Sequence, residues 1–317
     1  MTNKPGKKLA LTGATGFVGK QLLADCLAAG HAVTALARTS QPDQPGVQWV
    51  LGDLDDDEAL KTLVGDADVV FHLAGLTKAL DRSEFDRVNA DRTAKLAEIC
   101  RDHEVPHFVF LSSLAATRPS VSPYAASKAK AEKMLAQFDE LAMRITPIRA
   151  PVVLGPGDSA TRPLFAGLVK GVIAVPAGKA GQFRFSIIDV RDLSQLMLSL
   201  VDETKEPQGL IAPYGQQYVQ WRNIADSAGV VLNRRIKEIG VPSPVLAFVA
   251  RATDIAARLT RKPNVFSRDK IVEMNAGEWI ADHPVDNPYS LEETLRRCLT
   301  PFSKSLTSSP KTFPQEF

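Results

Sequence analysis

Short apolar runs alternate with helix-like segments from residue 8 to about residue 155. The apolar runs predict strands at 8–11, 32–37, 47–51, 68–73, 108–111 and 145–154. Apolar residues at helical spacing predict helices at 17–29, 57–64, 89–101 and 124–138. Several strand segments lack a polar residue at every second position, which is typical of a parallel sheet buried on both faces. The pattern therefore predicts an α/β fold with a doubly wound parallel sheet over residues 1–155.

The pattern changes after residues 155–157, where proline and glycine become frequent and the strict alternation fades. We expect residues 156–300 to form a smaller substrate-binding lobe, except that a strand and a helix near 185–201 return to the first domain. Further helices are predicted at 221–229 and 244–260. The tail, 301–317, is polar, contains three prolines and is expected to be flexible.

The predicted helix at 244–260 has large apolar residues along one side and basic residues near its far end. The apolar residues are Val245, Phe248, Val249, Ile255 and Leu259, and the basic ones are Arg251, Arg258, Arg261 and Lys262. The simpler interpretation is that the apolar side covers the small lobe. The alternative, which the sequence leaves open, is contact with a membrane surface or a lipid substrate. Other apolar residues of this region that suggest a bulky substrate are Pro244, Pro263 and Phe266.

A glycine-rich turn, 13–19, joins the first predicted strand to the first predicted helix with the spacing GxxGxxG. Glycines let the backbone turn tightly and approach a pyrophosphate, while the helix N-terminus offers N–H groups and a positive dipole end. We therefore expect a Rossmann-like dinucleotide-binding domain, with an ordinary tight turn as the alternative. The residues expected to bind the cofactor here are Gly13, Thr15, Gly16, Phe17, Val18 and Gly19.

The end of the second strand indicates which cofactor is bound. A site for NAD usually has an acidic residue there, which holds the ribose 2′-hydroxyl. This sequence has Arg38 instead, followed by Thr39 and Ser40, and an arginine can pair with a 2′-phosphate. We expect NADP(H) to be preferred, with NAD(H) as a possible cofactor; a solvated surface arginine is the alternative. Asp53 and Leu54 follow the third strand, where a loop can face the adenine.

Candidate catalytic groups follow the later strands. Tyr124 and Lys128 are four residues apart and so share one face of a predicted helix. The fifth strand ends in Ser112-Ser113, which delivers a hydroxyl to the carboxyl end of the sheet, where open α/β folds bind ligands. The fourth strand ends in Leu73, Ala74 and Gly75, a turn of small residues that can lie against a cofactor.

With these motifs the sequence resembles the extended short-chain dehydrogenases/reductases. The matching segments are TGATGFVG at 12–19, GDL at 52–54, HLAG at 72–75, VNADRT at 88–93, FLSS at 110–113, YAASK at 124–128 and RAPVVLGPGD at 149–158, with FSIIDVRDLSQ at 185–195 as a weaker match. The order of these segments makes the resemblance specific over about the first 200 residues. The spacing of 11 residues between Ser113 and Tyr124 is shorter than usual, and Leu154 stands where a tyrosine is common.

The resemblance implies roles for individual residues. Tyr124 would be the general acid/base, Ser113 would orient the reacting oxygen, and Lys128 would lower the pKa of the tyrosine and bind the nicotinamide ribose. Asn89 would support this network, with a helix N-cap as the alternative role. Pro151 and Val152 would line the nicotinamide. The family also implies that the protein is a monomer or a homodimer.

Composition excludes several other classes. The 317 residues carry 38 Lys+Arg against 36 Asp+Glu, a net charge of +2, which gives no indication of a nucleic-acid partner. Three widely spaced cysteines, and histidines without partners at ligand spacing, argue against a disulfide framework and a metal site. No apolar stretch approaches the roughly 18 residues of a membrane span. We expect a cytoplasmic protein that binds a small-molecule substrate.

Three functions fit these features. The first is an NADP(H)-dependent oxidoreductase that acts on a ketone or secondary alcohol of a bulky, lipid-like substrate. The C-terminal segment loosely resembles the 3β-hydroxysteroid dehydrogenase and dihydroflavonol reductase branch of the family, and SSLAATRPSVSPYAASK at 112–128 resembles bacterial proteins that reduce 3-oxo-sphingolipids. The second resemblance implies 3-oxo-sphingolipids as a candidate substrate. The second is a nucleotide-sugar epimerase or dehydratase with tightly bound NAD, although the short loop and Leu154 argue against a sugar nucleotide. The third is a non-catalytic sensor that binds NADP(H). The intact serine, tyrosine and lysine favour an enzyme.

Overall fold

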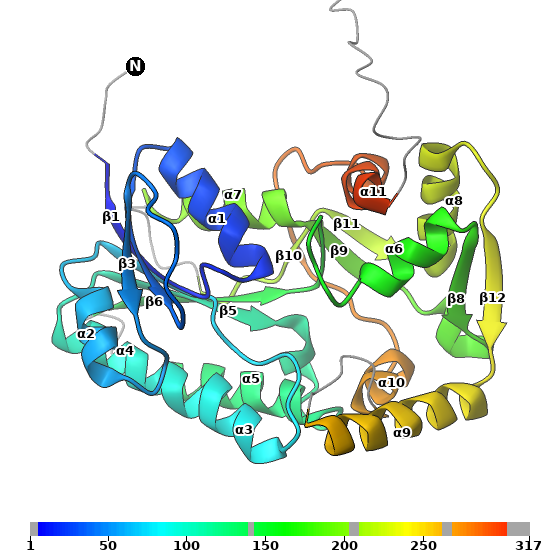
Figure 1. The fold of residues 1–317 in the computed structure, drawn as a ribbon, viewed down its shortest axis with the longest axis horizontal. Helices are drawn as coiled ribbons and strands as arrows, with labels where there is room; N and C mark the ends of the chain where they lie inside the picture. Colours follow the sequence, from blue (N-terminus) through cyan, green and yellow to red (C-terminus); the bar gives the residue numbers. More distant parts are fainter. Residues whose placement is uncertain (1–5, 139–142, 203–208, 262–267, 303–317) are drawn as a thin grey trace, which may run out of the picture.

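A six-stranded parallel sheet forms the larger part of this computed structural model, which describes residues 6–138, 143–202, 209–261 and 268–302. Its strands are β1 (Lys8–Thr12), β2 (Ala32–Ala37), β3 (Val47–Leu51), β4 (Val69–His72), β5 (His107–Ser113) and β6 (Arg144–Ala150). They lie in the order β3-β2-β1-β4-β5-β6. The doubly wound, Rossmann-like sheet predicted from the sequence is therefore confirmed, and Figure 1 shows it in the half of the molecule that holds the N-terminus.

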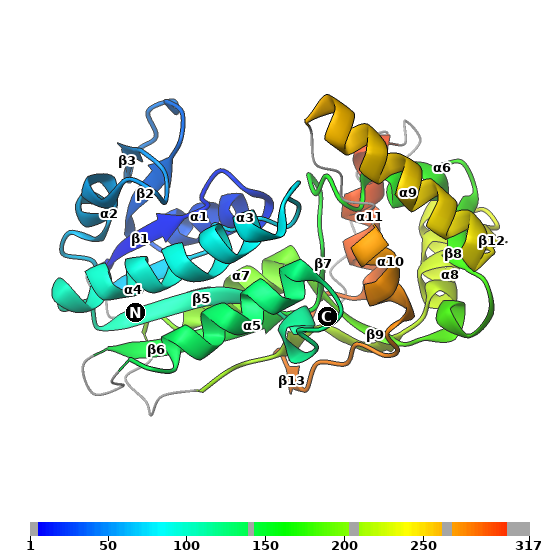
Figure 2. The same ribbon diagram turned by 90° about the horizontal axis from the view of Figure 1, so that it is seen from below.

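Helices cover both faces of this sheet, as parallel strands buried on both sides require. The helices are α1 (Phe17–Ala28), α2 (Asp57–Val64), α3 (Arg82–Asp86), α4 (Arg92–Asp102), α5 (Pro123–Leu135) and α7 (Val190–Ser199). Apolar side chains of α1 and α7 form one core with β1, and those of α2, α4 and α5 form a second core on the other face. Figure 2 shows α4 and α5 side by side across the sheet from α1.

The remaining elements form a second group, called the small lobe below. Its strands are β7 (Val152–Leu154), β9 (Phe185–Asp189) and β11 (Gln216–Val219) in one sheet, β8 (Val172–Pro176) with β12 (Lys237–Val241), and β10 (Pro213–Tyr214) with β13 (His283–Pro284). Its helices are α6 (Arg162–Val169), α8 (Trp221–Leu232), α9 (Ser243–Thr260), α10 (Arg268–Asn275) and α11 (Leu291–Leu299). A separate core joins these elements. The division of the chain near residue 155 stays a prediction.

The predicted strand at 145–154 is wrong as a single element. It divides at Pro151 into β6, which belongs to the large sheet, and β7, which pairs with β9 in the small lobe. Proline has no N–H to donate to a sheet, so the ladder cannot continue through this position. The chain therefore passes from one sheet to the other beside the ends of the central strands.

The simpler sequence interpretation of helix α9, that its large apolar residues cover the small lobe, is wrong. The described residues against the lobe are small, with Ala250 fully buried and Ala257 nearly so, whereas Phe248 and Leu259 remain 74% and 81% exposed. No helix of the described residues is long and apolar enough to cross a membrane. The predictions for Lys262, Pro263 and Phe266, and for the tail beyond Phe302, concern residues outside those described.

Candidate active site

The glycine-rich turn brings the N-terminal end of α1 against the segment that follows β4. Gly13 has φ +74°, which favours glycine. A Cβ on Gly13 would lie 2.7 Å from the backbone nitrogen of Ala74, and one on Gly19 would lie 2.0 Å from the carbonyl oxygen of Gly13. Among the described side chains none caps α1 at Gly16, so the N–H groups of its first turn can bind a phosphate. The turn fits the pyrophosphate of a dinucleotide.

A cavity of about 280 Å³ lies at this end of α1. It is lined on one side by Thr15, Gly16, Phe17 and Lys20, and on the other by Pro156 and Gly157 from the loop after β7. The cavity is therefore bordered by the glycine-rich turn and by a segment of the small lobe.

The central strands end together at one edge of the sheet. Thr12 of β1 is in register with His72 of β4, and Ser113 of β5 is in register with Ala150 of β6. The strand order reverses between β1 and β4, and ligands of open α/β sheets bind at such a switch point. The predicted cofactor residues that follow these strands directly, and so reach this edge, are Leu73, Ala74 and Gly75 after β4 and Pro151 and Val152 after β6.

The structure brings the predicted serine and tyrosine together. Ser113 ends β5 and is hydrogen-bonded to Tyr124, which stands in the first turn of α5. The Ser113 Oγ also accepts the N–H of Ala115 at 3.2 Å and caps a short 3-10 helix, Leu114–Thr117. The ring of Phe85 packs edge-on against Tyr124, with 6.2 Å between the centroids. The short loop between the two residues is thus compatible with their contact.

Lys128 lies one helical turn after Tyr124 and is buried. Its Nζ donates to the carbonyl oxygen of Leu111 at 2.9 Å and lies 4.6 Å from the centroid of the Phe110 ring. Burial lowers the pKa of Lys128 to about 8, although the nearby Glu132 carboxylate opposes this effect. Lys128 therefore loses its proton more easily than an exposed lysine does, and an anion bound nearby would stabilise its ammonium form.

The pKa of Tyr124 is raised above its ordinary value. Burial is the largest cause, the hydrogen bond with Ser113 acts in the opposite direction, and the carboxylate of Glu273 raises the pKa further. The structure does not show the lowering by Lys128 that the family resemblance implies, because the loss of hydration on burial disfavours the phenolate. Tyr124 is thus protonated at neutral pH, as a general acid must be.

Asn89 is fully buried in a π-helical turn, Arg87–Asp91, that precedes α4. Its Nδ2 donates to the carbonyl oxygen of Leu76 at 2.9 Å and to the Oγ of Ser127 at 3.0 Å, and its Oδ1 accepts the N–H of Leu76 at 2.7 Å. Asn89 therefore joins the segment after β4 to α5 and is not the N-cap of the predicted helix. Such π-turns are frequent at functional sites.

A buried polar chain, absent from the sequence predictions, continues from Asn89 to the first strand. Thr93 donates to the carbonyl oxygen of Asn89 at 2.9 Å, so its oxygen accepts from Nε2 of His72 at 2.9 Å. The Nδ1 of His72 then accepts from the hydroxyl of Thr12 at 2.7 Å, and the Thr12 oxygen accepts the N–H of Ala74 at 3.2 Å. This pattern requires a neutral imidazole, and burial lowers the pKa of His72 to about 3.

Arg38 and Asp53 line a hollow of about 590 Å³ at the ends of β2 and β3, beside Leu54. The other acidic residues that line the hollow are Asp55, Asp56, Asp57 and Glu58. Arg38 is exposed and has no ion pair within the described ranges. Its guanidinium is thus available to an anionic ligand in this hollow.

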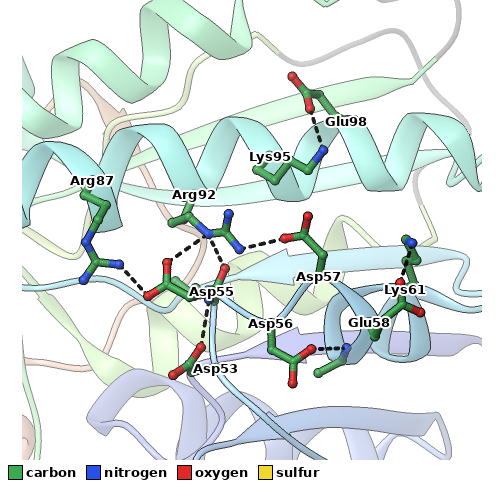
Figure 3. A network of polar contacts seen from close by, with 12 residues as sticks. Asp53, Asp55, Asp56, Asp57, Glu58, Lys61, Arg87, Arg92, Lys95 and Glu98 are labelled. Atoms are coloured by element: carbon green, nitrogen blue, oxygen red, sulfur yellow. Dashed lines mark hydrogen bonds and ion pairs between the residues drawn. The ribbon is translucent and has the colours of Figure 1, made fainter.

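The acidic residues of the hollow have partners of their own, as Figure 3 shows. Asp55 pairs with Arg87 and, at 3.3 Å, with Arg92, which also pairs with Asp57 at 2.7 Å. The carboxylate of Asp56 accepts the N–H of Ala59 and caps α2. The run 55–58 is therefore organised by ion pairs and a helix cap. Ion pairing also reduces the repulsion that these carboxylates would exert on a phosphate.

Two contacts attach the small lobe to the loop before Tyr124. Ser122, which caps α5, donates to Oε1 of Glu273 at 2.6 Å, and both side chains are buried. Arg118 donates to two carbonyl oxygens of segment 276–278, each at 2.6 Å, and its guanidinium lies 4.4 Å from the centroid of the Trp279 ring. Helix α10 is therefore held close to the candidate catalytic tyrosine.

The sequence matches a family model and is similar to characterised enzymes. Residues 9–211 match the model of the NAD dependent epimerase/dehydratase family. Ceramide reductase of Caulobacter vibrioides is 30% identical over 276 residues, which cover 86% of this chain and 85% of that protein. UDP-glucose 4-epimerase of Vibrio cholerae is 26% identical over 262 residues, 75% of this chain and 80% of that protein.

The fold also matches solved structures. The UDP-N-acetylglucosamine 4-epimerase from Methanobrevibacter ruminantium M1, in complex with UDP-N-acetylmuramic acid, superposes with a TM-score of 0.71 at 20% identity. The match covers 94% of this chain and 99% of that one. At this identity the likeness shows the fold, and it extends through the small lobe.

Proposed function

Because this chain belongs to the NAD dependent epimerase/dehydratase family and is an NAD(P)-dependent enzyme of the short-chain dehydrogenase/reductase type, we propose that it is an NADP(H)-linked reductase of a bulky, lipid-like ketone. The observation that carries the proposal is the 30% identity to ceramide reductase over 86% of the chain, which extends well beyond the family model's last residue, 211. A 3-oxo-sphingolipid is the candidate substrate, and the reverse reaction would oxidise the secondary alcohol.

The proposed catalytic roles follow from the contacts in the site. Tyr124 would give its proton to the carbonyl oxygen during reduction, which suits a phenol whose pKa is raised. Ser113, hydrogen-bonded to Tyr124, would orient the same oxygen. Lys128 would bind the ribose of the cofactor and stabilise the phenolate that remains. A bound nicotinamide supplies the hydride. Asn89 would act as a positioning residue, since it holds α5 through Ser127.

The proposed cofactor site extends from the candidate catalytic residues to the far end of β2. The pyrophosphate would lie on the turn 13–19, and the adenine near Asp53 and Leu54. Leu73, Ala74 and Gly75 would lie along the cofactor, and Pro151 and Val152 would lie against the nicotinamide. Arg38 would pair with the 2′-phosphate, and this contact is the reason for proposing NADP(H) rather than NAD(H).

An epimerase that keeps NAD bound is the second candidate function. The similarity to UDP-glucose 4-epimerase over 75% of the chain favours it. The two candidates differ in what happens to the cofactor, because a reductase must exchange it at every turnover whereas an epimerase re-reduces its own intermediate.

The deciding experiment begins with mass spectrometry of the nucleotide released by denaturing the purified protein. We expect substoichiometric nucleotide, and tighter binding of NADPH than of NADH in a fluorescence titration. Arg38→Ala should lower NADPH affinity about 10- to 100-fold, the value of a charge-assisted contact, and leave NADH affinity unchanged. Arg162→Ala, which removes an arginine at the start of α6 in the small lobe, is the matched control.

Turnover is then measured with a short-chain N-acyl 3-oxo-sphinganine and with UDP-glucose. We expect NADPH oxidation with the first and none with the second, and Tyr124→Phe should abolish turnover while retaining NADPH affinity. Stoichiometric NAD with conversion of UDP-glucose would instead establish the epimerase. A Tyr124→Phe variant with unchanged turnover would exclude the proposed catalytic role.

A further inference from the structure

Helix α9 carries an apolar face on the side opposite to the one that packs on the small lobe. At 100° per residue, Leu246, Ala250, Thr253 and Ala257 share the inner side of the helix, and Ala250 and Ala257 are buried. The large apolar residues on the outer side are Val245, Phe248, Val249, Ile255 and Leu259, which are 43–81% exposed. The helix thus buries small residues and exposes its large ones, the reverse of an ordinary surface helix.

This exposed face continues on α10, which packs against α9. Figures 1 and 2 show the two helices side by side on the outside of the molecule. Val272 of α10 is 49% exposed, and the next residue, Glu273, makes the buried hydrogen bond to Ser122 at the start of α5. A surface that met this face would therefore lie close to the segment that holds Tyr124.

The charges of the helix favour an anionic partner. The sequence 243–261 contains three arginines and one aspartate, and Arg251 and Arg261 are exposed. On the helix, position 251 borders the apolar face, and Arg261 follows the last turn. An apolar face with basic residues at its border is the pattern of helices that lie in the plane of a membrane interface.

From this arrangement we infer that α9 and Val272 form a docking surface for an anionic lipid bilayer. The inference rests on the proposed lipid substrate and deepens it, because a docked enzyme could take a two-chain substrate from the membrane without passing it through water. Phe248 and Leu259 are the most exposed side chains of the surface and would insert most deeply. The competing occupant is a second copy of the chain, which would cover the same face in a dimer.

The test is flotation of the intact protein with vesicles of phosphatidylglycerol and phosphatidylcholine in equal amounts, without substrate. We expect binding that weakens at high salt and on pure phosphatidylcholine. Phe248→Ser/Leu259→Ser should lower the partition coefficient about tenfold or more, and Arg251→Glu should reduce binding to the anionic vesicles only. Val230→Ser is the matched control, because Val230 is 63% exposed on α8 of the same lobe and should have no effect.

Several outcomes would overturn the inference. One is absence of binding to anionic vesicles at low salt, and another is equal binding by wild type and Phe248→Ser/Leu259→Ser. A third is a wild-type dimer in light scattering that this double variant converts to a monomer, which would assign the face to self-association. Turnover of a short-chain, water-soluble ketone without vesicles is measured in parallel. Loss of vesicle binding with normal turnover would refute the docking surface alone, and vesicle binding without turnover would refute the proposed reductase alone.

Discussion

The affinity for NADPH should depend on pH through Lys128. Its amine is buried against the Phe110 ring and the Leu111 carbonyl, and its pKa is lowered to about 8. A lysine that binds the cofactor's ribose beside the charged phosphates should bind as the ammonium. Cofactor binding above pH 8 must therefore include the uptake of a proton, and the affinity should fall as the pH rises.

The expected magnitude follows from the pKa. At pH 7 about a tenth of the unliganded enzyme has neutral Lys128, and at pH 9 about nine tenths has. If only the ammonium form binds, the apparent Kd rises about tenfold between these pH values, which equals about 1.4 kcal/mol.

The assay is a fluorescence titration with NADPH at pH 7, 8 and 9 and constant ionic strength. Lys128→Arg keeps a permanent charge and should lose the pH dependence, whereas Lys128→Met should bind weakly at every pH. Wild-type affinity that is constant from pH 7 to 9 would refute the reasoning. So would a Lys128→Arg variant that shows the same tenfold change, because the titrating group would then lie elsewhere.

Three further predictions concern residues that surround the candidate catalytic groups. The folded-state pKa of His72, about 3, lies below the ordinary 6.5, so the contribution of this group to the free energy of unfolding is present above pH 6.5 and is lost as the pH falls. Between pH 7 and 5 His72 should account for about 2 kcal/mol of the loss measured by urea unfolding, in addition to the loss from the buried His107, whose pKa is also lowered to about 3; His72→Gln should remove the His72 part alone. Gly75→Ala places a Cβ 2.9 Å from Oδ1 of Asn89 and should lower kcat/KM about tenfold or more, whereas Gly209→Ala, with open space around it, should leave it unchanged. Arg118→Ala removes two hydrogen bonds and a ring contact, so the free energy of unfolding should fall by about 2–4 kcal/mol. Arg118→Lys keeps the charge and should recover part of this loss. Equal stability of the wild type and both variants would show that the contacts of Arg118 with segment 276–279 do not stabilise the protein.

Local patterns in the sequence were enough to determine the large sheet and to select the residues of the candidate site. The strands at 32–37 and 47–51 are found with the predicted bounds, since apolar runs of parallel strands stand out from the helices between them. Ser113, Tyr124 and Lys128 could be selected because strand ends and helical spacing are local properties. The glycine-rich turn was recognisable for the same reason, and backbone contacts at Gly13 and Gly19 explain why glycine is required there.

Only the tertiary structure decided the features that depend on residues distant in the chain. The partners of His72 are Thr12 and Thr93, which lie 60 and 21 residues away, and no spacing rule connects them. The sequence showed only a histidine at the end of an apolar strand, and its register with Thr12 came from the folded sheet. The contact between Ser122 and Glu273 spans 151 residues and likewise leaves no local trace.

The pKa of Tyr124 and the exposed face of α9 also depend on tertiary packing and could not be predicted from the sequence. The sequence places a lysine one turn from Tyr124 and so suggests a lowered pKa, but burial of the phenol raises the pKa, and burial depends on everything packed around the group. The apolar periodicity of α9 was visible in the sequence, yet periodicity alone does not say which side of a helix meets the protein. That choice belongs to packing, which placed Ala250 inside and left Phe248 outside.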